Sequence, residues 1–105
     1  MPIRERNPSD QPNAAQTRER AKVQERAETM ALNMIAFLLA DEERADGFFG
    51  TTGLSPDDLR AGVGQPAFLG GVMDYLLERE DLLVAFCEDN KIDPMQPMRI
   101  RQVLP

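Results

Sequence analysis

Residues 30–40, MALNMIAFLLA, form the most apolar run of this 105-residue chain. Together with Ala27, the apolar residues of this run recur every three or four positions, which is the spacing of one helix face. Further apolar positions widen that face over most of the circumference, as in a helix at the centre of a domain. The run has eleven residues, whereas a bilayer span needs about 20. We therefore expect a central core helix that begins within residues 15–25 and ends near Ala40.

The chain before this run is polar. Residues 1–13 contain three prolines and little apolar surface, so burial cannot compensate for the entropy of ordering them, and we expect a disordered N-terminal tail. Residues 14–28 contain strong helix formers and neither glycine nor proline, which predicts a polar helical extension of the central helix. Residues 29–105 are expected to form the helical domain.

Turn signals divide the middle of the chain into short helices. Asp41 can cap a helix over about 42–50, and Gly53 can end that helix in the left-handed conformation. Ser55 is followed by a proline and two aspartates, which is a strong start signal for a helix over about 56–61.

The last third of the chain continues this pattern. Pro66 begins an apolar segment whose rhythm is interrupted at residues 79–81, so we expect one helix before this point and another after it. Asp93 and Pro94 repeat the cap-and-proline signal for a last helix that reaches Pro105. No alternating pattern predicts a strand. The expected fold is all-α, a small orthogonal bundle of five to six mostly short helices.

Several segments follow one another in a distinctive order: AFLLAD (36–41), TGLSPDDLR (52–60), GQPAFL (64–69), DYLL (74–77) and LLVAF (82–86). This pattern resembles the bacterial family called domain of unknown function 3572, over about residues 31–92. The resemblance implies a small helical cytoplasmic bacterial protein. Because the family has no established activity, the resemblance implies no catalytic residue.

The composition excludes several classes of function. The chain has no histidine and one cysteine, Cys87. It therefore has no Ser-His-Asp or Cys-His catalytic pair, no imidazole-ligated zinc or haem, and no internal disulfide. We expect no catalytic residue, no cofactor and no metal. A lone cysteine also fits a reducing cytoplasm.

Charge is distributed unevenly along the chain. The net charge is −6, but residues 29–98 carry −9 and residues 1–28 carry +1. An acidic body repels nucleic acid and anionic lipid, so we expect neither nucleic acid nor membrane as a partner.

The candidate partner-binding residues are Arg18, Lys22 and Arg26 in the extension and Met95 and Met98 near the C-terminus. The extension is either a solvated helix or a segment that becomes ordered on a partner. Methionine side chains adapt well to binding surfaces, and these two are the methionines that we expect to be exposed. We therefore expect a non-enzymatic adaptor or regulatory module that binds another protein or a second copy of itself as a homodimer.

Two alternatives come from other classes. One is a nucleic-acid-associated regulator that uses the extension as a basic arm. The other is a carboxylate-based metal-binding protein or enzyme, although the acidic run at residues 41–46 lacks the spacing of a calcium loop.

Packing expectations concern six further positions. Leu38 and Phe86 belong to the expected core, and Cys87 is expected to be buried with a normal or raised pKa. Tyr75 is expected at the rim of the core with its hydroxyl in water. The pair Gly70–Gly71 lies inside a helix, which reflects either sequence drift or the close approach of another helix backbone, from this chain or from a partner.

Overall fold

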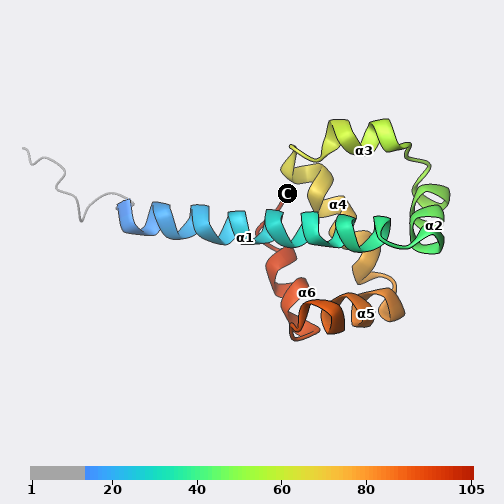
Figure 1. Cartoon of the computed structure of the whole chain (residues 1–105). Helices are drawn as coiled ribbons and strands as arrows, with labels where there is room; N and C mark the ends of the chain where they lie inside the picture. Colours follow the sequence, from blue (N-terminus) through green and yellow to red (C-terminus); the bar gives the residue numbers. More distant parts are fainter. Residues whose placement is uncertain (1–13) are drawn as a thin grey trace, which may run out of the picture.

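A computed structural model describes residues 14–105, with side chains from Arg18 onwards, and the regular secondary structure of this part of the chain is all helical (Figure 1). The helices are α1 (Ala14–Leu39), α2 (Glu42–Thr52), α3 (Pro56–Gly62), α4 (Pro66–Leu77), α5 (Glu80–Asn90) and α6 (Met95–Arg101). The all-α prediction is confirmed, and so is the break between α4 and α5. The expected tail at residues 1–13 lies outside the described residues, and the expected boundary at residue 28 lies within the continuous helix α1.

Helix α1 is the axis of the molecule. The other helices surround its C-terminal half, while its N-terminal half projects beyond them (Figure 1). It packs against α2, α4 and α6. The buried residues of α1 repeat at helical spacing, as its apolar stripe predicts: Ala27, Met30, Ala31, Met34, Ile35, Phe37 and Leu38.

Side-chain caps fix the boundaries of the short helices α2 and α3. The Asp41 carboxylate accepts a hydrogen bond from the Arg44 N–H (3.0 Å), which caps the start of α2. Gly53 ends that helix at φ 74°, a left-handed conformation that favours glycine. Ser55 and Asp58 each accept a hydrogen bond from the other's backbone N–H and form a capping box at α3.

Arg79 occupies the break between α4 and α5. Its backbone is extended, and its guanidinium lies 3.9 Å from the centre of the Tyr75 ring and donates to the Tyr75 carbonyl oxygen (3.0 Å). Tyr75 also packs edge-on against Phe48, with ring centres 5.0 Å apart, and is only 8% exposed. The Tyr75 ring therefore lies deeper in the core than the expected rim position, because these two neighbours cover it.

The last helix is shorter than the sequence predicts. Helix α6 ends at Arg101 instead of continuing to Pro105, and residues 102–104 form turns. These turns return Leu104 to the core, where it is 5% exposed. The start signal is also displaced by one residue, because Pro94 is the capping residue while the Asp93 carboxylate accepts from the Met95 N–H.

The described helices include none with both the length and the apolar character needed to cross a membrane.

Candidate functional site

The N-terminal extension is a helix that has little tertiary packing. From Arg18 to Arg26 every side chain is exposed except that of Val23, which is partly buried. Ala27 is the first buried residue among the described side chains of α1. The helical conformation before Ala27 therefore depends on strong helix formers and on continuity with the buried half of α1.

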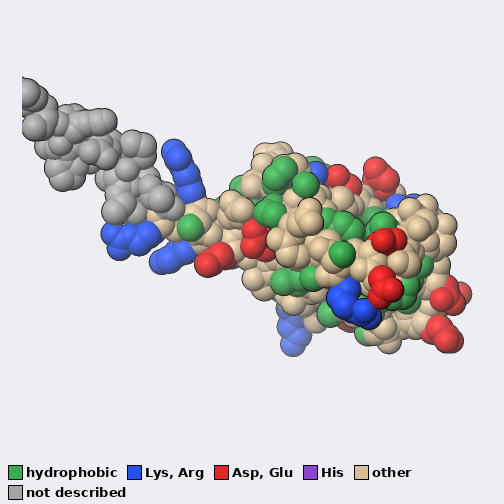
Figure 2. All heavy atoms as spheres, turned by 90° about the horizontal axis from the view of Figure 1, so that it is seen from above, with side chains coloured by type: hydrophobic (Ala, Val, Ile, Leu, Met, Phe, Trp, Pro, Cys, Tyr) green, Lys and Arg blue, Asp and Glu red, His purple; other side chains and the backbone are tan. Residues whose placement is uncertain are grey.

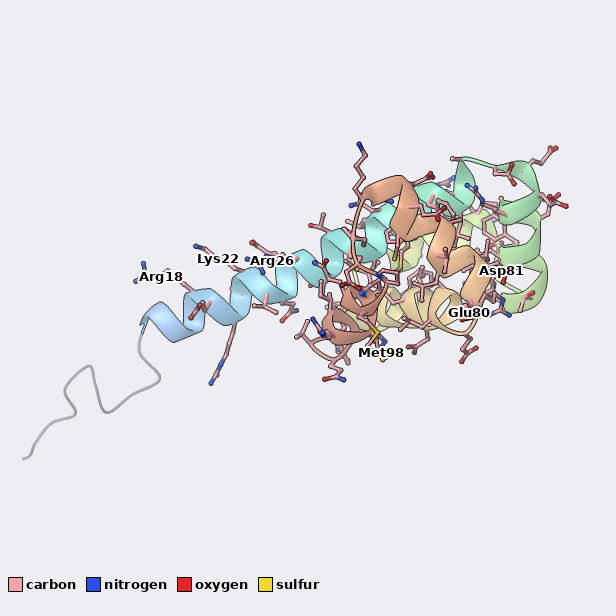
Figure 3. All side chains as sticks on the ribbon, turned by 90° about the horizontal axis from the view of Figure 1, so that it is seen from below. Arg18, Lys22, Arg26, Glu80, Asp81 and Met98 are labelled. Carbon is pink, nitrogen blue, oxygen red and sulfur yellow. The ribbon has the colours of Figure 1, made fainter. Side chains whose placement is uncertain are left out.

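Three basic residues form a stripe along the extension. Arg18, Lys22 and Arg26 are four residues apart, so they are neighbours on one face of α1 (Figure 3). Like charges at this spacing destabilise a helix by about 0.2–0.5 kcal/mol per pair. Neither Lys22 nor Arg26 forms an ion pair with any residue that the structure describes. An anionic surface laid along this stripe would therefore relieve the repulsion.

The stripe leads into a groove of about 470 Å³ between α1 and the junction of α5 with α6, which we call the α1–α6 groove. Four lining residues are apolar: Met30, Phe86, Ile92 and Ile100. The remaining lining residues are polar or charged: Lys22, Glu25, Arg26, Thr29, Asn33, Asn90 and Gln96. Most of these polar residues are exposed, whereas Met30 and Phe86 are buried, so the groove has an apolar floor and a polar rim.

A tight reversal after α5 builds the far wall of this groove. Lys91 adopts the left-handed conformation at φ 56°, and the Ile92 N–H then donates to the Cys87 carbonyl oxygen (3.0 Å). Asn90 supports the end of α5 by donating from its side chain to the Phe86 carbonyl oxygen (2.9 Å). The chain therefore turns back within a few residues, and Ile92 and Ile100 both come to line the groove.

The structure separates the predicted partner-binding residues into two groups. Lys22 and Arg26 line the α1–α6 groove, and Arg18 lies one turn farther out along the same stripe. Met95 and Met98 are 50% and 51% exposed, which confirms their expected exposure, but neither lines the groove.

Helical spacing explains why the methionines are set apart. Gln96 and Ile100, four residues apart, share the groove side of α6, whereas Met95 and Met98 project from other parts of its surface (Met98 is labelled in Figure 3). Sequence reasoning missed the apolar floor as a site. The one available signal was the apolar spacing of Ile92 and Ile100, which equally fits ordinary core residues.

A second hollow lies against the other side of the extension, with a volume of about 610 Å³. Val23 and Val103 are its apolar residues, and charged or polar side chains complete it: Glu19, Arg20 and Gln24. It shares no residue with the α1–α6 groove. Both sides of the extension therefore remain open.

The charge of the surface differs between the two ends of the molecule. Basic side chains lie along the extension, and acidic ones gather at the opposite end of the body (Figure 2). Among the described side chains, no three acidic or cysteine residues lie close enough together to hold a metal ion. Cys87 is 2% exposed, and burial raises the pKa of its thiol, with a further increase from the Asp93 carboxylate. This thiol is consequently a poor nucleophile at neutral pH.

Residues 24–105 match the model of a family described as "Protein of unknown function (DUF3572)". The matched region contains the whole α1–α6 groove except Lys22, whereas Arg18 and Lys22 precede it. No curated protein and no solved structure matches the chain.

Proposed function

The chain belongs to the DUF3572 family, whose function is unknown, and from this premise we propose that it is a non-enzymatic protein-interaction module. Its partner binds along the N-terminal extension and the α1–α6 groove. One observation carries the proposal: α1 continues for about 20 Å before Ala27, the first buried residue among its described side chains. Lys22 and Arg26, which form no ion pair with any residue that the structure describes, lead directly onto an apolar floor.

The burial pattern supports a binding role for this region. Packing accounts for the apolar stripe of α1 from Ala27 onwards, but it does not account for the helix before that residue. Ile92 and Ile100 are only partly buried, so apolar surface remains available in the groove. A partner that covers this surface would gain hydrophobic free energy in proportion to the apolar area removed from water.

A nucleic-acid-associated regulator is the second candidate, and the basic stripe is the observation that favours it. Three cations on one helix face can contact a phosphate backbone. Two features favour a protein instead: the domain from residue 29 to 98 carries −9, and the groove floor is apolar. Phosphate groups gain nothing from an apolar floor.

Site-specific photocrosslinking in the native cells tests the proposal. A photoreactive phenylalanine replaces Thr29, an exposed residue that lines the groove, or Ala61, an exposed control residue on α3. We expect a discrete protein adduct from the Thr29 position and none from the Ala61 position. Nuclease-sensitive adducts would support the second candidate, and equal labelling from both positions would overturn the proposal.

A further inference from the structure

We propose that the occupant of the α1–α6 groove is an acidic amphipathic helix of a partner protein, with apolar side chains that enter the groove and carboxylates along the basic stripe. This inference rests on the proposed function and specifies the chemistry of the partner.

The floor of the groove selects apolar anchors. Phe86 and Met30 are 1% and 8% exposed, so the bottom of the groove is already packed. Ile92 and Ile100 keep part of their surface open beside them. A volume of about 470 Å³ is within the range of pockets that bind ligands. Because the groove runs beside α1, apolar residues three or four positions apart on a docked helix can enter it together.

The rim selects the charge of the occupant. Lys22 and Arg26 line the groove without an ion-pair partner among the described residues, and Glu25 is the acidic lining residue. Two more exposed cations, Lys91 and Arg99, directly adjoin the floor residues Ile92 and Ile100 in the chain, and the exposed Asp93 adjoins Ile92 on its other side. The four cations at the groove therefore outnumber the two carboxylates, those of Glu25 and Asp93. The net positive charge around the groove contrasts with the acidic body. Carboxylates on the partner would therefore be attracted here and repelled elsewhere on the molecule.

A second copy of the chain fits the groove less well. Glu80 and Asp81, at the start of α5, could supply carboxylates and lie far from the extension (Figure 3). Helix α5, however, buries Phe86 and Cys87 in the core of its own chain, and its one exposed large apolar side chain is Val84, at 39%. One anchor cannot cover a floor formed by four apolar residues.

The test uses the full-length chain and a synthetic 14-residue helix with leucine at positions i, i+3, i+4 and i+7 and glutamate at most others. A matched peptide with lysine in place of every glutamate is the control. By fluorescence anisotropy at low salt, we expect the acidic peptide to bind about tenfold or more tightly than the basic one. Amide shift changes in NMR spectra should centre on residues 86–100 and the facing part of α1.

Variants on the rim separate charge from folding. Arg26→Glu should weaken binding of the acidic peptide about tenfold, while Arg60→Glu, the same charge change at an exposed position of α3, should leave it unchanged. Gln96→Glu adds a carboxylate to the opposite wall and should also weaken binding. Circular dichroism melts confirm that each variant is folded before binding is compared.

Several outcomes would overturn the inference. They are equal affinity for the two peptides, no binding of the acidic peptide at 1 mM, or shift changes away from the groove. Displacement of the peptide by a single-stranded oligonucleotide would instead indicate nucleic acid. Release of the peptide as the chain self-associates, with the self-association measured by sedimentation velocity, would indicate that a second copy occupies the groove. A crosslinked protein at position 29 without peptide binding would refute this inference alone, whereas peptide binding without any crosslink would refute the proposed function.

Discussion

The guanidinium of Arg101 forms two parallel hydrogen bonds with the carboxylate of Asp74, 27 residues earlier in the chain: Nε to Oδ1 at 2.8 Å and Nη2 to Oδ2 at 3.0 Å. Its third nitrogen, Nη1, donates to the Leu104 carbonyl oxygen at 2.9 Å. One side chain thus joins α6 to α4 and also holds the segment that follows α6. The paired geometry makes this contact stronger and more specific than a single surface ion pair.

Removing either partner of this ion pair should destabilise the domain. We expect Arg101→Met and Asp74→Asn each to lower the free energy of unfolding by about 1 kcal/mol, because charge-assisted hydrogen bonds are lost at a half-exposed site. Urea unfolding of both single variants and the double variant gives their coupling energy. The control pair, Arg60 and Asp57, is 77% and 87% exposed at the same 2.8 Å distance and should couple by less than about 0.5 kcal/mol. Equal coupling at the two sites would contradict the prediction.

The adjacent glycines of α4 should respond in opposite ways to alanine. A Cβ at Gly70 would lie 2.9 Å from the Pro105 backbone oxygen and 3.0 Å from the Arg101 guanidinium carbon. Nothing lies within 4 Å of a Cβ at Gly71. We therefore expect Gly70→Ala to lower the melting temperature and Gly71→Ala to raise the stability by up to about 1 kcal/mol, the helix-propensity difference. Stabilisation by both substitutions would show that the C-terminal segment moves aside easily.

The contrast between these glycines also shows what sequence alone can predict. Caps at Asp41 and Ser55 depend on neighbours within three residues, so their positions could be predicted and are confirmed. The end of α6 and the burial of Tyr75 depend on distant contacts, those of Arg101 with Asp74 and of Tyr75 with Phe48. No periodicity in the sequence reports such contacts. Close approach of another helix backbone was one interpretation of the Gly70–Gly71 pair, but a backbone approaches Gly70 alone, and it is that of Pro105, which lies outside the helices.

The candidate site also has a part that the sequence predicts and a part that depends on distant contacts. The spacing of Lys22 and Arg26 places both on one helix face, which the sequence reveals directly. The groove beside them depends on the left-handed reversal at Lys91, which brings Ile92 and Ile100 against α1. The sequence does not predict a left-handed turn at this lysine, because glycine or asparagine is the usual residue at such a position. The binding role of all these residues stays a prediction.

A buried charge in the core should abolish cooperative unfolding. Leu38 and Phe86 are each 1% exposed, so Leu38→Asp and Phe86→Asp would place a carboxylate among apolar side chains. The penalty is several kcal/mol, comparable with the whole stability of a domain of this size, about 5–10 kcal/mol. Thermal melts followed by circular dichroism should lose their sigmoidal transition. Leu32→Asp is the control on the same helix as Leu38, because Leu32 is 44% exposed and should tolerate the change.

The thiol of Cys87 should make the domain less stable at alkaline pH. Burial raises the pKa of this thiol in the folded state, and the Asp93 carboxylate raises it further. A free thiol in the unfolded chain has a pKa of about 8.5. The folded state therefore holds the proton more tightly, so the stabilisation is complete below about pH 8.5 and is lost as the pH rises through the higher folded pKa. Urea unfolding at several pH values above neutrality should show a steeper loss of stability for the natural chain than for Cys87→Ala. Identical slopes, or rapid labelling of the native thiol by a disulfide reagent at pH 8, would show that Cys87 is not shielded as described.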